Sequence, residues 1–115
     1  MKLYSYPSCG TCRKALSWLR DKRILIEPID ITQHPPTYEE LEEALEQIGR
    51  KRLFNTSGQS YRALGAKAVQ AMDDRQALEA LAADGKLIKR PFLISDSGKT
   101  LTGFKPEEWE AVLRS

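Results

Sequence analysis

The sequence is poor in the residues that mark several protein classes. Only two of its 115 residues are cysteine and one is histidine, too few for a disulfide-stabilised secreted scaffold or a four-ligand zinc site. No apolar run approaches the roughly 18 residues that a membrane span requires, and the N-terminus lacks the apolar stretch of a signal peptide. We therefore expect a cytoplasmic protein with no membrane partner and no metal.

Motifs of several enzyme and binding classes are also missing. The chain contains no GxGxxG, no phosphate loop, no GxSxG and no HExxH. Aromatic residues make up 8% of the chain and do not alternate with a basic stripe, and the net charge is only +2. These features argue against direct nucleic-acid binding.

Hydrophobic periodicity predicts a single α/β domain over residues 1–115, in the order strand, helix, strand, helices, hairpin and helix. The predicted elements are strands at 2–6, 24–31, 87–94 and 100–103, helices at 10–22 and from 106 onward, and a helical insertion at about 37–84. The strand–helix–strand start implies a parallel pair with a right-handed crossover, and the hairpin adds antiparallel strands. We expect a small mixed β-sheet flanked by helices.

Both cysteines lie in one motif between the first predicted strand and the first predicted helix, Pro7-Ser8-Cys9-Gly10-Thr11-Cys12-Arg13-Lys14. At this place Cys9 meets the unpaired N–H groups and the positive dipole end of the helix, which favour a thiolate. Arg13 and Lys14 add positive charge nearby. Cys12 lies one turn further on the apolar face and should stay a neutral thiol. The spacing predicts an attacking Cys9 and a resolving Cys12.

Two other interpretations of this motif stay open at the level of sequence. The two thiols could be unreactive residues at the start of a helix. A zinc site could also use them, but beyond the cysteines the chain offers only the distant His34, which is expected in a loop beside prolines.

Taken together, these residues resemble the arsenate reductase (ArsC) family, which has a thioredoxin-like fold with an inserted helical segment. The resemblance covers nearly the whole chain. The motifs that carry it are Pro7 to Ala15, Leu53-Phe54-Asn55-Thr56, Tyr61-Arg62-Ala63-Leu64-Gly65, Ile88-Lys89-Arg90-Pro91 and Thr102-Gly103-Phe104. Within the family the chain is most similar to the Spx/MgsR branch of thiol-based regulators, whose CxxC it shares, and to their uncharacterised reductase-like relatives.

The resemblance implies roles for residues around the motif. Cys9 matches the nucleophilic cysteine of the family. Arg90, before what would be a cis Pro91, matches an arginine that holds an oxyanion near the sulfur. The substrate-binding residues implied are Gly10, Thr11 and Pro91.

The same resemblance argues against efficient arsenate reduction. Arsenate reductases of this type use two further arginines, which would fall at Asn55 and near Gly103 in this chain. Since neither position is arginine, the resemblance implies a poor arsenate reductase.

Two functions follow as expectations. The first is a thiol oxidoreductase without a bound cofactor, linked to glutathione or glutaredoxin or acting on a thiol-containing protein. The alternative is an Spx/MgsR-type redox-sensing regulator that binds the RNA polymerase α-subunit. Gly49 falls on the partner-contacting glycine of those regulators, although it is also a natural end for the preceding helix.

Overall fold

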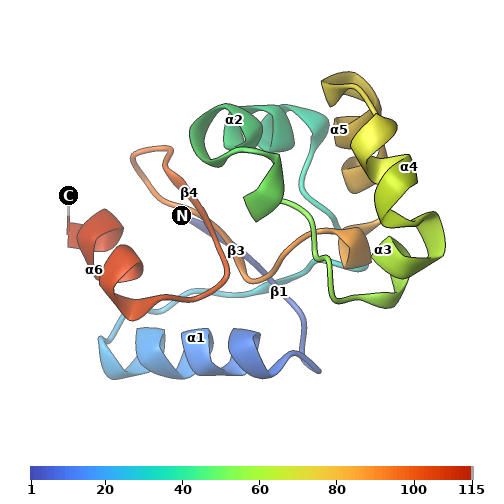
Figure 1. The fold of residues 1–115 in the computed structure, drawn as a ribbon. Coiled ribbons are helices and arrows are strands. Elements are labelled where there is room, and N and C mark those ends of the chain that lie inside the picture. The colour runs from blue at the N-terminus through green and yellow to red at the C-terminus, as the bar shows by residue number, and fades with distance from the viewer. Residues whose placement is uncertain (115) are drawn as a thin grey trace.

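The computed structural model describes residues 1–114 and contains a mixed four-stranded sheet between two layers of helices (Figure 1). The strands are β1 (Lys2–Ser5), β2 (Ile29–Asp30), β3 (Phe92–Ile94) and β4 (Thr100–Thr102), and their order in the sheet is β2-β1-β3-β4. Strands β1 and β2 are parallel, whereas β3 is antiparallel to both β1 and β4. The expected parallel pair and hairpin are therefore confirmed.

The helical segments follow the predicted order. They are α1 (Gly10–Asp21), α2 (Tyr38–Ile48), η1 (Arg50–Arg52), α3 (Gln59–Leu64), α4 (Ala66–Ala71), α5 (Asp74–Ala83), η2 (Gly85–Leu87) and α6 (Pro106–Arg114). A capping box begins α2, because Thr37 and Glu40 each accept the other's amide hydrogen. Within residues 1–114, no helix has the length and apolar character needed to span a membrane.

Side chains alternate along β1 and so divide the core between the two faces of the sheet. Leu3 packs in the layer under α1 and α6, with Ala15, Leu19 and Trp109, whereas Tyr4 packs in the layer under α2 and α5. Figure 1 shows these helix pairs on opposite sides of the sheet. Complete burial of each large apolar side chain contributes about 1.5–3 kcal/mol, so both faces stabilise the sheet.

Two predicted strands were too long. Strand β2 contains only Ile29–Asp30, because β1 offers it few partners and Pro28 has no amide hydrogen for the ladder. The segment 24–28 runs outside the sheet, and Leu25 is 90% exposed.

The strand predicted at 87–94 begins only at Phe92. Residues 87–89 pair instead with the segment that follows η1: Asn55 donates its amide hydrogen to the Leu87 carbonyl (2.8 Å), and Lys89 donates to the Leu53 carbonyl (2.7 Å). Because of this pairing, the segment after η1 lies next to the residues that precede β3.

The register of the sheet brings distant parts of the chain together at one end. Tyr4 lies opposite Phe92, and Phe92 lies opposite Thr102. Three segments therefore meet at this end of the sheet: the loop after β1, the residues before β3 and the residues after β4. A hydrogen bond from the Gly103 amide to the Pro91 carbonyl (3.0 Å) joins two of these segments.

Candidate active site

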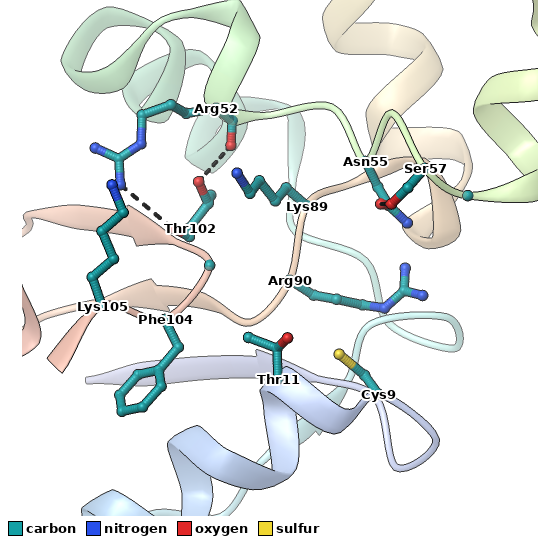
Figure 2. Close-up of a pocket in the computed structure, with 12 residues that line it drawn as sticks. Cys9, Thr11, Arg52, Asn55, Ser57, Lys89, Arg90, Thr102, Phe104 and Lys105 are labelled. Carbon is teal, nitrogen blue, oxygen red and sulfur yellow. Dashed lines mark hydrogen bonds between the residues drawn. The ribbon is translucent and has the colours of Figure 1, made fainter.

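A cleft of about 530 Å³ lies at this end of the sheet. Figure 2 shows its lining residues, which come from four separate segments. They are Cys9 and Thr11 at the start of α1, Arg52, Asn55, Ser57 and Gly58 from η1 to the start of α3, Lys89 and Arg90 before β3, and Thr102, Gly103, Phe104 and Lys105 after β4. Cys9 contributes the only thiol among them.

Cys9 is the N-cap residue of α1. Its backbone is extended, its amide donates to the Tyr6 carbonyl (3.0 Å), and its sulfur accepts the Cys12 amide hydrogen at 3.3 Å. Serine, threonine, aspartate or asparagine usually accepts that hydrogen bond. A sulfur in this place satisfies the helix end best when it is negatively charged, because the N-terminus carries a partial positive charge.

The environment of Cys9 favours its thiolate. Partial burial raises the pKa of Cys9, but hydrogen bonds from the Cys12 thiol and amide, the charge of Arg90 and the Thr11 amide together lower the pKa below its ordinary value. The Arg13 guanidinium, which the sequence suggested as a source of charge, donates to the Pro7 carbonyl (2.9 Å). Arg90, distant in sequence, acts on the sulfur.

Cys12 has the opposite character. It is 1% exposed on the buried face of α1. Burial raises the pKa of its thiol to about 11, and the hydrogen bond that it donates to Cys9 adds to the increase. The surroundings of the two sulfurs thus shift their pKa values in opposite directions, downward for Cys9 and upward for Cys12.

Arg90 places a positive charge beside Cys9. Figure 2 shows the Cys9 sulfur pointing toward the Arg90 side chain. Nη1 of Arg90 donates to the Lys86 carbonyl at 3.4 Å, and the guanidinium lies 5.2 Å from the centre of the Tyr6 ring. Its buried Nε has no hydrogen-bond partner, and no carboxylate pairs with the side chain within residues 1–114. The adjoining Arg90–Pro91 peptide is cis.

The other predicted site residues lie in different surroundings. Thr11 lines the cleft, whereas Gly10 and Pro91 do not: Gly10 is exposed at the first position of α1, and Pro91 is buried. Asn55 and Gly103 both line the cleft.

Gly49 is absent from the cleft lining and ends α2 with a φ of 80°.

Sequence reasoning missed three cations of the cleft: Arg52, Lys89 and Lys105. Arg52 lies in the basic run Arg50-Lys51-Arg52, whose positive charge is favourable at the C-terminal end of the preceding helix and so indicated no site. Lys89 appeared only as the neighbour of Arg90 in its motif. No spacing rule joins positions 52, 89 and 105, since only the sheet register and the 87–89 pairing bring them together. In the part of the chain that the structure describes, no three His, Cys, Asp or Glu side chains form a potential metal site.

Comparisons with known proteins find relatives that match nearly the whole chain. A family model described as the ArsC family matches residues 4–112. The uncharacterized protein YusI of Bacillus subtilis is 45% identical over 113 residues, 96% of this chain and 95% of its own. The regulatory protein MgsR of B. subtilis is 33% identical over 94% of this chain and 86% of its own. A solved structure described as a possible arsenate reductase from Streptococcus mutans is 41% identical with a TM-score of 0.84, covering 95% of this chain and 96% of its own.

Proposed function

The chain belongs to the ArsC family, and from this premise we propose that it is a cytoplasmic thiol–disulfide oxidoreductase that uses Cys9 and Cys12. One observation carries the proposal: the half-buried sulfur of Cys9 caps α1 and accepts the amide hydrogen of Cys12 at 3.3 Å, and hydrogen bonding by the Cys12 thiol helps to lower the pKa of Cys9. The pair thus combines a stabilised thiolate with a second thiol in contact with it. Two free thiols of this kind suit a reducing compartment.

The reaction begins when the Cys9 thiolate attacks one sulfur of a disulfide substrate. A Cys9–substrate disulfide forms, and the second half of the substrate leaves as a thiolate that takes a proton. Cys9 then no longer carries the negative charge that, in addition to burial, raised the pKa of Cys12. Cys12 loses its proton more readily, attacks Cys9 and releases the remaining substrate thiol. Two electrons pass to the substrate, and a Cys9–Cys12 disulfide remains.

Glutathione or glutaredoxin would return the protein to its dithiol form. The unpaired charge of Arg90 beside Cys9 favours anionic partners. The family resemblance implies that the cleft is poorly equipped for arsenate, because the two further arginines of arsenate reductases would fall at Asn55 and near Gly103. We therefore propose weak arsenate reduction at most.

Selective alkylation tests the proposal. Reduced protein is treated briefly with iodoacetamide at neutral pH, and the modified residue is located by peptide mass spectrometry. We expect Cys9 to react much faster than Cys12, and Cys9→Ser to react hardly at all while folded. Equal rates at the two cysteines, together with no internal disulfide after mild oxidation, would sink the proposal.

The second candidate function is a redox-sensing regulator that binds the RNA polymerase α-subunit. It is favoured by the similarity to the regulatory protein MgsR and by the setting of Gly49. That residue is half-exposed, and a Cβ placed on it would meet no atom within 4 Å, so a partner's backbone can approach closely.

A pull-down from cell lysate distinguishes the two functions. It is run with the reduced and the oxidised protein. Redox-dependent recovery of RNA polymerase supports the regulator. Recovery of mixed-disulfide partners through Cys9 alone supports the oxidoreductase.

A further inference from the structure

The cleft has a strong excess of positive charge. Four of its lining residues are cations, the described lining contains no carboxylate, and the cations are Arg52, Lys89, Arg90 and Lys105. Like charges gathered in a partly enclosed space repel one another. A cleft of this composition is suited to a ligand that carries negative charge.

The cations occupy two ends of the cleft. In Figure 2, Arg90 extends on the side of Cys9, whereas Lys89 leaves the same segment in another direction, toward Thr102 and Arg52. Adjacent residues of an extended chain point to opposite sides, which accounts for this divergence. A Cβ placed on Gly103 would lie 3.4 Å from Cε of Lys89, so the lysine stem runs beside the residues after β4 at this end.

Charges at the end away from Cys9 are incompletely neutralised. Arg52 pairs with Glu108 of α6 at 2.9 Å, and its side chain remains 34% exposed. Neither Lys89 nor Lys105 forms an ion pair or a side-chain hydrogen bond within residues 1–114. Three cations and one carboxylate therefore leave positive charge that a ligand can use.

We propose that Arg52, Lys89 and Lys105, here called the distal cations, form a carboxylate-binding subsite that selects small disulfides bearing carboxylates. The proposal rests on the proposed function, since it assumes that the substrate sulfur meets Cys9. A cleft of about 530 Å³ is in the range that encloses a small molecule. In this proposal the attacked sulfur lies at Cys9 and a carboxylate of the same disulfide lies toward the distal cations, which line the same cleft.

The step that the subsite serves is the exchange already described. The Cys9–sulfur bond forms as the substrate S–S bond breaks, and the departing thiolate takes a proton from water. Cys12 then displaces the second thiol. Each substrate molecule takes two electrons from the dithiol, so pre-reduced protein completes one turnover without another reductant.

The test compares disulfides of different charge with pre-reduced protein. The probes are 3,3′-dithiodipropionate (two carboxylates), bis(2-hydroxyethyl) disulfide (neutral) and cystamine (two ammonium groups). Each second-order rate constant is divided by that of 2-mercaptoethanol with the same disulfide, which removes intrinsic differences in reactivity. We expect the normalised rate to be highest for the dianion and lowest for the dication, and the dianion's advantage to shrink with added salt.

Variants assign this preference to the distal cations. Loss of a charge-assisted contact in this partly exposed site should lower the rate with dithiodipropionate about fivefold to tenfold in Lys89→Gln. The same variant should change the rate with bis(2-hydroxyethyl) disulfide less than about twofold, because the neutral probe reports only the reactivity of Cys9. The control is Lys67→Gln, an exposed lysine on α4 outside the cleft, which should change neither rate.

The outcomes separate the two proposals. Equal normalised rates for the three probes, or an equal effect of Lys89→Gln on charged and neutral probes, would overturn the subsite and leave the oxidoreductase function standing. Failure of the reduced protein to react with any probe would overturn the oxidoreductase function and the substrate subsite with it.

Discussion

Cys12 donates its amide hydrogen to the sulfur of Cys9, with the nitrogen 3.3 Å from Sγ, and hydrogen bonding by its thiol lowers the pKa of Cys9. One residue thus stabilises the thiolate before the reaction and lies in contact with the sulfur that it must attack afterwards. Burial raises the pKa of Cys12 to about 11, and the hydrogen bond that its thiol donates to Cys9 adds to that increase while lowering the pKa of Cys9. Attack and resolution are therefore assigned to different sulfurs before any substrate arrives.

The pH dependence of alkylation at Cys9 should reflect its environment. Because its pKa is lowered, the thiolate persists as the pH falls, and the rate profile should have its midpoint below the roughly 8.5 of a free cysteine. Arg90→Gln removes a charge that lowers this pKa, so the midpoint should rise and the rate at neutral pH should fall. Lys14→Gln, an exposed cation on the same helix, is the control, and an equal shift in both variants would contradict the role of Arg90.

The side chain of Cys12 should influence Cys9 through its donated hydrogen bond. Cys12→Ala removes the thiol donor and should raise the pKa of Cys9, whereas Cys12→Ser keeps a hydroxyl donor and should raise it less. Ultraviolet absorbance of the thiolate, followed against pH, measures both. Cys12→Ala should also cost about 1 kcal/mol of unfolding free energy, as is typical of a buried truncation. An identical Cys9 pKa in the two variants would show that the thiol hydrogen bond has no effect.

Arsenate reduction with glutathione and glutaredoxin should be weak or absent. Each charge-assisted contact is worth about 1.5–3 kcal/mol, so two missing arginines should lower productive binding roughly 10²-fold or more. Asn55→Arg restores one cation to the lining and should increase turnover. Thr56→Arg, at an exposed neighbour outside the lining, is its control. Robust turnover by the natural sequence at low millimolar arsenate would contradict this prediction.

Gly49→Arg distinguishes docking from disulfide exchange. If the protein is a regulator, a bulky cation at this position should abolish capture of the RNA polymerase α-subunit, and disulfide exchange should be largely retained. Gly49 has a φ of 80°, so the substitution itself strains the backbone by about 1–3 kcal/mol. Gly65→Arg is a matched control, because Gly65 has a φ of 89° and equal space around it. Equal loss of capture in both variants would point to destabilisation.

Local features of the site could be predicted because neighbouring residues determine them. The placement of Cys9 at the start of a helix, and of Cys12 on its buried face, depends only on a strand end, a turn of helix and an apolar stripe. The role of Arg90 was predicted only from the family resemblance, because no periodicity in the sequence links Arg90 to Cys9.

Features that depend on long-range pairing could not be predicted. The 87–89 segment has apolar residues typical of a strand, yet it pairs with residues 53–55 outside the sheet. That pairing places Lys89 beside Arg52. The excess of charge in the cleft therefore emerges only from the tertiary structure.

The central claim, that Cys9 attacks and Cys12 resolves, is tested most directly by trapping the intermediate. Reduced protein, Cys9→Ser and Cys12→Ser are each treated with one equivalent of bis(2-hydroxyethyl) disulfide, and the products are mapped by peptide mass spectrometry. The account predicts a Cys9–Cys12 disulfide in the natural sequence, a stable adduct on Cys9 in Cys12→Ser and almost no adduct in Cys9→Ser. A stable adduct on Cys12, or an adduct on Cys9 that persists while Cys12 is present, would contradict it.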